Sequence, residues 1–439
     1  MERDLIARHI SHVKELRLLC PMEEVWSMCI ALQDTPTPLL ETFSLSYSNI
    51  SDSDRDAANM PSHLFRCKMP KLICLSFHGC MLPRDPKIFT STITCVQLSY
   101  PAQFNIGLPT QDELLGALRR MPALQELVLK HCLLQFLSTQ DLMSPPAVEF
   151  NDLRSMVLVD DLHRCLAFIC SVGIPIDATV DLSCSVANLI VNDIFYEFAK
   201  AGKLFSSARP FLALTIGVSK EGECVRIQGW THLSDSDAST IGDGPPSFSI
   251  TLGFERDIMP VHFVLLLQIC HPMPLRDLRI LSVRLDASQI SGLGSFWDKQ
   301  HWGLLFKNCL AVRHIIVSQS VAPLLLGSLQ EYVVALPGDF QPGRRSGFGH
   351  LQTLSIDFID PHEDNTLDAL FPTELAEALA FAQSDGSMGP ISIHISEWED
   401  LEIWRKEHKS VHPLPKQRHF QEGSFWKKFN EMVSRKLSL

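Results

Sequence analysis

Two stretches of the sequence decide the fold, MPKLICLSFHGC at residues 69–80 and MPALQELVLKHC at residues 121–132. Laid over each other, they share the pattern M-P-x-L-x-x-L-x-(L/F)-x-x-C. In a chain that is 46% apolar, three matching apolar positions would be common, but a longer match that includes a proline and a cysteine is not. The chain therefore contains an internal repeat, which has to be followed before any other pattern is interpreted.

The core of this repeat, L-x-x-L-x-L, recurs through much of the chain. The first six copies open at positions 13, 40, 72, 93, 124 and 153, so their spacings are 27, 32, 21, 31 and 29 residues. These spacings are close to the period of about 20 to 29 residues of leucine-rich repeats, lengthened by insertions. The clear copies are Val13/Leu16/Leu18, Leu40/Phe43/Leu45, Leu72/Leu75/Phe77, Ile93/Val96/Leu98, Leu124/Leu127/Leu129, Leu153/Met156/Leu158, Leu278/Leu281/Val283, Val312/Ile315/Val317 and Leu351/Leu354/Ile356.

Burial explains why such a repeat should stack. The last two apolar residues of a copy are two positions apart, so both lie on one face of a short strand. A single strand cannot bury that face, whereas parallel stacked copies can, with the crossover segments returning along the outside. Cys80 and Cys132 follow three residues after the last apolar position, where leucine-rich repeats use Asn or Cys to satisfy the turn backbone. We therefore expect an α/β fold, a leucine-rich-repeat-like solenoid with irregular repeats, a curved parallel sheet inside and helices outside.

Several crossovers have the signals of helices. Thr110 to Glu113 form a capping box, an apolar face follows from Leu114 to Met121, and Pro122 ends the segment. Asp160 and Asp161 are interpreted as the start of a helix, because acidic residues favour that end of the helix dipole. Further helices are expected at residues 23–32, 162–172, 188–201, 261–270, 297–307 and 374–382.

The 125 residues between positions 153 and 278 allow two interpretations. Weaker copies at Val180/Leu182, Phe211/Leu214/Ile216 and Ile250/Leu252 would continue the array, whereas residues 212–218 and 224–230 could instead pair as a β-hairpin in an inserted β-rich segment. Both remain open at this point. The expected organisation is a regular array at 1–175, degenerate repeats or an inserted β-rich segment at 176–275 with a loop at 234–246, a resumed array at 276–395, and a Trp-rich cap or tail at 396–439.

Composition excludes several classes of function. The chain has 38 Lys and Arg against 50 Asp and Glu, and its net charge of −12 disfavours nucleic acid and anionic lipid as partners. No apolar run reaches the roughly 18 residues of a membrane span. The 13 cysteines include no C-x-x-C pair, which favours reduced thiols and a cytoplasmic or nuclear location.

No motif indicates a cofactor, a metal or a catalytic centre. The sequence GDFQPGRR at residues 338–345 departs from a phosphate-binding loop, because Arg344 and Arg345 replace its lysine and its hydroxyl residue. Neither H-E-x-x-H nor G-x-S-x-G occurs. We therefore expect a protein that is not an enzyme and binds no cofactor or metal. The alternative is an enzyme whose site lies within residues 177–275 and gathers His232, Asp235 and a cysteine.

The carboxyl-terminal sequence FWKKFNEMVSRKLSL at residues 425–439 has helical spacing of Phe425, Trp426, Phe429, Met432 and Val433. It is interpreted as a capping helix that seals the last repeat. The alternative is a helix that docks a partner or lies on a membrane surface.

The stretches PLLETFSLSYSN, PSHLFRCKMPKLICLSFHGCMLP, TITCVQLSYP, TQDELLGALRRMPALQELVLKHC and PMPLRDLRILSV resemble fungal F-box proteins of the leucine-rich-repeat-like kind over roughly residues 10 to 360. The resemblance implies a repeat array that presents substrates to a cullin ubiquitin ligase, and a Skp-type adaptor as a further partner. Twelve residues precede the first copy and contain no L-P-x-E-(L/I) opening, so the F-box itself is not visible. The alternative is a stand-alone repeat scaffold unrelated to ubiquitination.

Either scaffold would bind a protein partner through strand positions that alternate with the buried leucines. Such positions line the concave face of a repeat array. Eight of them are candidates for partner binding: Thr42, His78, Gln97, Glu126, Lys130, Arg284, His314 and Asp357.

Overall fold

The structure, a computed structural model, forms two compact units by its contacts: Met1–Ala208 with Ser247–Phe254, and Arg209–Pro246 with Glu255–Leu439. We call them unit 1 and unit 2 and describe each by itself. The described residues are 6, 8–33, 35–47, 69–80, 88–102, 108–133, 146–186, 209–218, 224–233, 244–254, 270, 273–284, 309, 311–318, 321–322, 325, 350–357 and 392–396.

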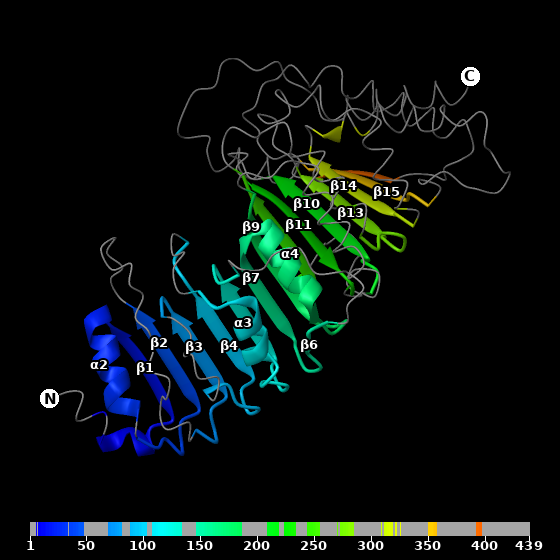
Figure 1. The fold of residues 1–439 in the computed structure, drawn as a ribbon. Coiled ribbons are helices and arrows are strands. Elements are labelled where there is room, and N and C mark those ends of the chain that lie inside the picture. The colour runs from blue at the N-terminus through cyan, green and yellow to red at the C-terminus, as the bar shows by residue number, and fades with distance from the viewer. Residues whose placement is uncertain are drawn as a thin grey trace, which may run out of the picture. The chain divides into compact units, whose positions relative to one another are not determined.

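Unit 1 is built on one parallel sheet (Figure 1). Every neighbouring pair of its strands is parallel, and each strand carries a copy of the repeat. A separate small sheet pairs β6 (Val148–Glu149) with β8 (Val172–Gly173). In spatial order the main strands are β1 (Glu15–Cys20), β2 (Thr42–Tyr47), β3 (Cys74–His78), β4 (Cys95–Ser99), β5 (Glu126–Lys130), β7 (Ser155–Asp161), β9 (Thr179–Ser185) and β12 (Phe248–Gly253).

The same backbone hydrogen bonds recur at the start of successive strands. The carbonyl of Glu41 accepts bonds from the amides of Ile73 and Cys74, at 2.8 and 3.0 Å. The carbonyl of Arg279 in unit 2 accepts in the same way from Arg313 and His314, at 2.8 and 3.0 Å. Because each bonded pair fixes the register of one strand on the next, the repeat sequence is also a repeat of geometry.

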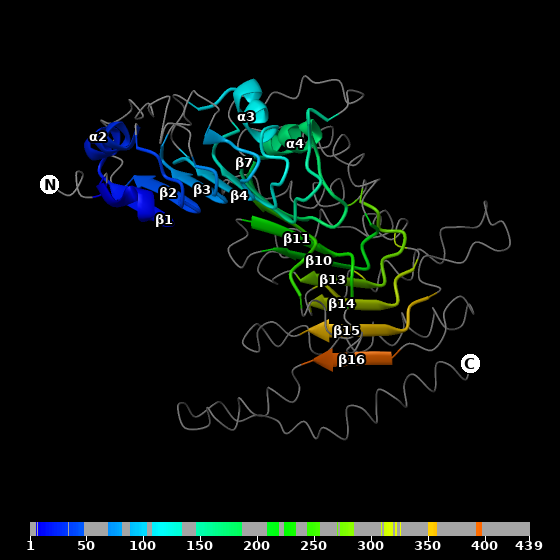
Figure 2. The ribbon, with the colours of Figure 1, turned by 90° about the horizontal axis from the view of Figure 1, so that it is seen from below.

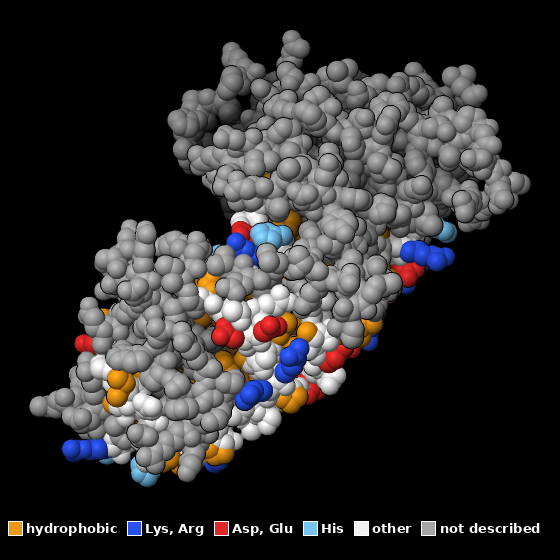
Figure 3. All heavy atoms as spheres, in the orientation of Figure 1, with side chains coloured by type: hydrophobic (Ala, Val, Ile, Leu, Met, Phe, Trp, Pro, Cys, Tyr) orange, Lys and Arg blue, Asp and Glu red, His pale blue; other side chains and the backbone are white. Residues whose placement is uncertain are grey.

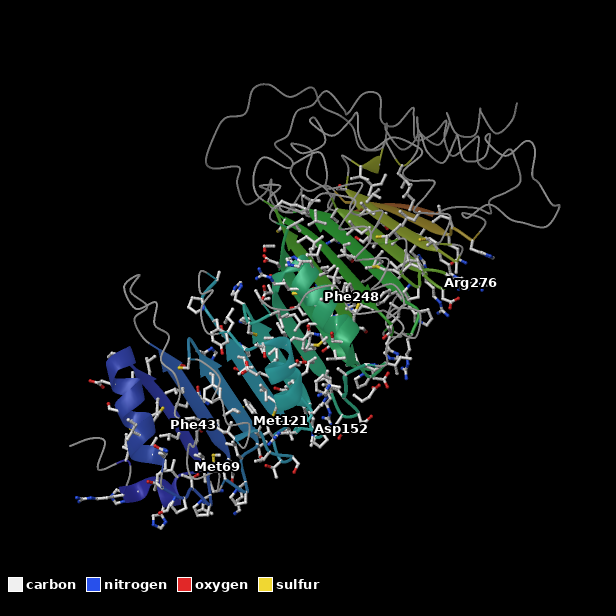
Figure 4. All side chains as sticks on the ribbon, viewed as in Figure 1. Phe43, Met69, Met121, Asp152, Phe248 and Arg276 are labelled. Atoms are coloured by element: carbon white, nitrogen blue, oxygen red, sulfur yellow. The ribbon has the colours of Figure 1, made fainter. Side chains whose placement is uncertain are left out.

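The apolar positions of the repeat form the core of unit 1. Phe43 and Phe77 are 0% and 1% exposed, and their rings meet edge to face with centroids 6.0 Å apart. Met69 and Met121, which open the two matching stretches, are both buried and precede β3 and β5 at the same edge of the sheet (Figure 4). The repeat therefore places equivalent residues in equivalent surroundings.

The turn after the strand also repeats. Cys80 is buried, and its thiol donates hydrogen bonds to the carbonyls of Leu45 and His78. Cys132 is 0% exposed at the matching position, so the turn role predicted for the two cysteines is confirmed by their burial and, for Cys80, by its bonds. The residue before each cysteine is in the left-handed region, with φ of 73° at Gly79 and 53° at His131.

Helices cover one side of the unit 1 sheet (Figure 2). They are α2 (Met22–Gln33), α3 (Gln111–Leu118) and α4 (Leu162–Ser171), and a short 3-10 helix, η1 (Ile10–His12), precedes β1. The capping box at Thr110 is confirmed, since Thr110 Oγ1 accepts from the Glu113 amide and Glu113 Oε2 accepts from the Thr110 amide. Asp161 is the N-cap residue of α4, as expected. The helices expected at 188–201, 297–307 and 374–382 lie outside the described residues, as does the helix expected at 261–270 apart from Cys270.

Unit 2 combines one antiparallel pair with a parallel array. Its strands in spatial order are β11 (Cys224–Trp230), β10 (Ala213–Val218), β13 (Ile280–Arg284), β14 (His314–Ser318), β15 (Thr353–Asp357) and β16 (Ser392–Ser396). The β10–β11 pair is antiparallel, as the hairpin interpretation predicted, and β10 also pairs with β13 in parallel, as the array interpretation predicted. The remaining pairs are parallel. Strand β16 was not predicted.

The fold is a leucine-rich-repeat-like solenoid with irregular repeats. This fold class is confirmed by the parallel strands, by their repeated register and by the helices on one side of the unit 1 sheet. The four-part division at residues 175, 275 and 395 stays a prediction, and most of the carboxyl-terminal segment 396–439 lies outside the described residues. Among the helices that the structure describes, none has the length and apolar character of a membrane span.

Candidate interaction face

The side of the unit 1 sheet opposite the buried leucines carries the residues available for binding. We call it the open face and define it by three rows of side chains, in which each residue is the register partner of the next. From β1 to β9 the rows are Glu15, Thr42, Cys74, Cys95, Glu126, Ser155 and Thr179; Arg17, Ser44, Ser76, Gln97, Val128, Val157 and Asp181; and Leu19, Ser46, His78, Ser99, Lys130, Val159 and Ser183.

Five of the eight predicted partner-binding residues lie on the open face. Thr42 and Glu126 share the first row, Gln97 lies in the second, and His78 and Lys130 share the third. Glu126 and Lys130, at the two ends of β5, are exposed, whereas the other three are partly buried. Because neighbouring strands are about 4.8 Å apart, the residues on β3, β4 and β5 lie within one binding footprint.

His78 is the titratable group in the middle of this footprint. Its Nε2 lies 2.9 Å from Ser76 Oγ, two residues earlier on β3. Partial burial lowers the pKa of His78, and the positive charge of Lys130 lowers it further. The lowered pKa favours the neutral imidazole, and because Nε2 is engaged with Ser76, Nδ1 is the ring nitrogen that remains for a partner.

The structure adds three residues that the sequence reasoning missed. Val128 and Val157 are register partners on β5 and β7, and Val159 is the register partner of Lys130. All three are only partly buried, and we call them the valine patch. The signal was present in ELVLK and SMVLVDD, where apolar residues occupy both alternations of the strand, but polar positions alone had been considered as binding sites.

Charge is sparse on the open face. Arg17 and Glu15 form an ion pair with each other on β1. Between them and Glu126 on β5, the rows on β2, β3 and β4 contain hydroxyl, thiol, amide and imidazole groups. On the helix-bearing side seen in Figure 3, acidic and basic side chains are interspersed without a continuous patch of either sign in its coloured part. Neither surface favours a polyanion.

In unit 2 the equivalent alternating positions are largely buried. Ala213, Ile280 and Ile316 form a buried cluster with Trp230, although they alternate with the leucines of the repeat. Both faces of the sheet are packed at these three positions, whereas Arg284 at the end of β13 is exposed. Ser282, next to the cluster, is 0% exposed.

The three remaining predicted residues lie on the sheet of unit 2. Arg284 is exposed at the end of β13, and Asp357 ends β15. His314, on β14, is the register partner of buried Ile280 on β13. Partial burial lowers the pKa of His314, with a smaller effect of Arg313. The structure thus brings five predicted residues together in unit 1, whereas the other three lie on strands β13, β14 and β15 of unit 2.

The residues considered for chemistry do not assemble among those the structure describes. No group of three or more His, Cys, Asp and Glu suited to a metal ion occurs in that part of the chain. His232 accepts a hydrogen bond from Arg209, with the two nitrogens 2.9 Å apart. Asp235 lies outside the described residues, as do residues 338–345. None of the described cysteines lies in a disulfide.

No family model and no curated protein matches the sequence. Among solved structures, the chain is similar to the leucine-rich repeat-containing protein LegL7 from Legionella pneumophila. The two are 13% identical, and the match covers 85% of this chain and 99% of that one with a TM-score of 0.25. A TM-score of 0.25 does not establish a shared fold, so the fold assignment rests on the strands and hydrogen bonds of this chain.

Proposed function

We propose that this chain is a protein-binding scaffold and that the open face of unit 1 binds the partner. The observation that supports this most directly is the valine patch on β5 and β7, bordered by exposed Glu126 and Lys130. Partly exposed apolar residues inside a polar surround are typical of the centre of a protein interface. The fold itself leaves the function open.

The geometry suits a folded protein or an extended peptide better than a small molecule. The rows run across β1 to β9 with small side chains such as Ser44, Ser46 and Ser99. Such a surface allows a partner to approach the sheet, while Gln97 and His78 supply directional hydrogen bonds. The low density of charge predicts binding that changes little with salt.

A finer proposal follows from the resemblance of the sequence to fungal F-box proteins. We propose that the array acts as the substrate-recognition part of a ubiquitin-ligase receptor in the cytoplasm or nucleus. The resemblance supports this proposal, and the described cysteines, none of which lies in a disulfide, agree with a reducing compartment. A stand-alone scaffold with the same open face remains the alternative.

Proximity labelling or affinity purification of the full chain tests the first proposal. Val157→Asp and the charge reversal Lys130→Glu should each lower recovery of the same partner at least about tenfold, because interface centres carry most of the binding energy. Asp152→Lys, an exposed charge reversal in the turn before β7, is the matched control and should retain the partner. If both open-face variants retain every partner of the wild-type chain, the open face is not the binding surface.

Recovery of an adaptor separates the two finer alternatives. A ubiquitin-ligase receptor should recover a Skp-type adaptor and a cullin from the same purification, and open-face variants should keep them while losing the substrate. A stand-alone scaffold should recover the partner without either protein.

A further inference from the structure

One pair of thiols on the open face differs from the other described cysteines. Cys74 on β3 and Cys95 on β4 are register partners in adjacent parallel strands. Neighbouring strands are about 4.8 Å apart, which lies within the Cα separation of about 4.4 to 6.8 Å that a disulfide requires. Both side chains are partly exposed, and the two thiols hydrogen-bond to each other. The sheet therefore holds them in contact where a solute can reach them.

Their surroundings make the two sulfurs unequal. The hydrogen bond from Cys95 is the main cause that lowers the pKa of Cys74 to about 7, with a smaller contribution from Arg17, while burial, Glu126 and Glu15 act in the opposite direction. The hydrogen bond with Cys74 raises the pKa of Cys95, as do burial and its register partner Glu126. Cys74 is therefore the more acidic of the two thiols, whereas Cys95 keeps its proton at neutral pH.

Most of the other described thiols are buried, and only Cys170 and Cys224 among them are partly exposed. Cys165 and Cys184 also hydrogen-bond to each other, but they are 0% and 3% exposed. Burial raises the pKa of Cys29 and of Cys80 to about 12. A thiol that is buried and protonated is a poor nucleophile, so contact between two sulfurs is not sufficient for reactivity.

We propose that Cys74 and Cys95 form a redox-modification site, which hydrogen peroxide converts to a disulfide and a dithiol reductant restores. The inference stands independently of the proposed binding function. In the first step the Cys74 thiolate attacks one peroxide oxygen, an S–O bond forms, the O–O bond breaks, and hydroxide leaves. In the second step the Cys95 sulfur attacks the sulfenic acid of Cys74, the S–S bond forms, and the S–O bond breaks.

The atoms and electrons balance with peroxide as the only oxidant. The departing hydroxide of the second step takes the proton of Cys95, and the hydroxide of the first step takes up the proton that Cys74 released to solvent when it ionised. Overall, two thiols and one hydrogen peroxide give one disulfide and two waters, with two electrons passing from sulfur to oxygen. A dithiol reductant reverses the change by thiol–disulfide exchange.

The test uses the full chain with Cys67→Ser in every variant, because Cys67 lies outside the described residues. Purified protein is treated with hydrogen peroxide at pH 7, the remaining thiols are alkylated, and the linked peptides are identified by mass spectrometry. We expect a Cys74–Cys95 link that dithiothreitol removes. It should form faster than partly exposed Cys170 is oxidised, because the pKa of Cys74 is lowered and Cys95 lies in contact with it.

Variants distinguish the thiol that attacks peroxide, Cys74, from the thiol that then forms the disulfide, Cys95. Cys95→Ser should leave a sulfenic acid on Cys74 that dimedone traps, and Cys74→Ser should leave Cys95 reduced. Arg17→Gln should shift the pH midpoint of peroxide consumption upward, a readout that a structural defect would not produce; circular dichroism checks that each variant folds. Oxidation of Cys74 and Cys95 without a link between them, or at the rate of Cys170, would overturn the proposal.

Discussion

Replacement of Asp160 by alanine should be among the most destabilising single changes in unit 1. Asp160 is 4% exposed at the end of β7. Its Oδ2 accepts a hydrogen bond from the amide of buried Leu133 at 2.9 Å, and its Oδ1 accepts from the amide of Asp161 at 2.9 Å and from Arg164 Nη1 at 3.1 Å. The carboxylate therefore joins the turn after β5 to the start of α4.

The magnitude follows from these partners. In Asp160→Ala the Leu133 amide loses its acceptor inside the protein, which costs about 1 to 3 kcal/mol, and a charge-assisted bond to Arg164 is lost as well. Arg164 is partly exposed and keeps Asp161 Oδ2 at 3.0 Å, so the full penalty of an isolated buried charge does not apply. We expect a loss of about 3 kcal/mol for alanine and about 1.5 to 2 kcal/mol for asparagine, which keeps one acceptor.

Urea unfolding at pH 7, followed by circular dichroism, measures the loss in the free energy of unfolding. Asp161→Asn is the matched control, because it removes a more exposed charge that pairs with the same arginine, and it should cost under about 1 kcal/mol. Hydrogen exchange should show faster exchange of the Leu133 amide in Asp160→Ala. If Asp160→Ala costs no more than Asp161→Asn, the carboxylate does not hold the two repeats together.

Three further predictions address the turn, a helix cap and pH. Gly79→Ala should destabilise by about 1 kcal/mol in urea unfolding, since φ of 73° is unfavourable for alanine, and Gly79→Asn should cost less. Thr110→Ala should cost about 1 kcal/mol in the same assay, and Thr110→Ser should restore most of it; equal losses would contradict the capping role. Because the pKa of His78 is lowered in the folded chain, the unfolded chain binds more protons than the folded chain near and below about pH 6.5, so the free energy of unfolding should decline there. The decline between about pH 7.5 and 5.5 should be smaller in His78→Gln than in the wild-type chain. The same dependence of stability on pH in both proteins would refute this.

The repeat could be predicted because its signal is local in sequence. The spacing within Leu72/Leu75/Phe77 determines which side chains share a strand face, and a strand with one apolar face must stack on others. The capping box at Thr110 was readable for the same reason, since its two hydrogen bonds join residues three apart. Strand β16 was missed because its copy, Ile393 and Ile395, was not recognised among polar neighbours.

The candidate site was only partly predictable. Alternation placed Thr42, His78, Gln97, Glu126 and Lys130 on one face, but the same rule does not tell whether a face stays uncovered. In unit 2 the corresponding face is packed around Trp230, which lies on the antiparallel strand β11. The sequence allowed both a hairpin and a parallel array here, so it could not predict that this face is covered. The valine patch and the Cys74–Cys95 contact both depend on which strand lies next to which.

The sequence by itself determined the repeat, the inward apolar residues and the turn cysteines, because each depends on the spacing of residues within one strand and its turn. The tertiary structure decided which alternating positions remain open, which thiols touch and which carboxylate is buried. Those properties depend on the register between strands 20 to 30 residues apart, as with Cys74 beside Cys95 and Asp160 beside Leu133. Register between separate strands is fixed by the sum of many packed side chains and is not encoded in any single segment.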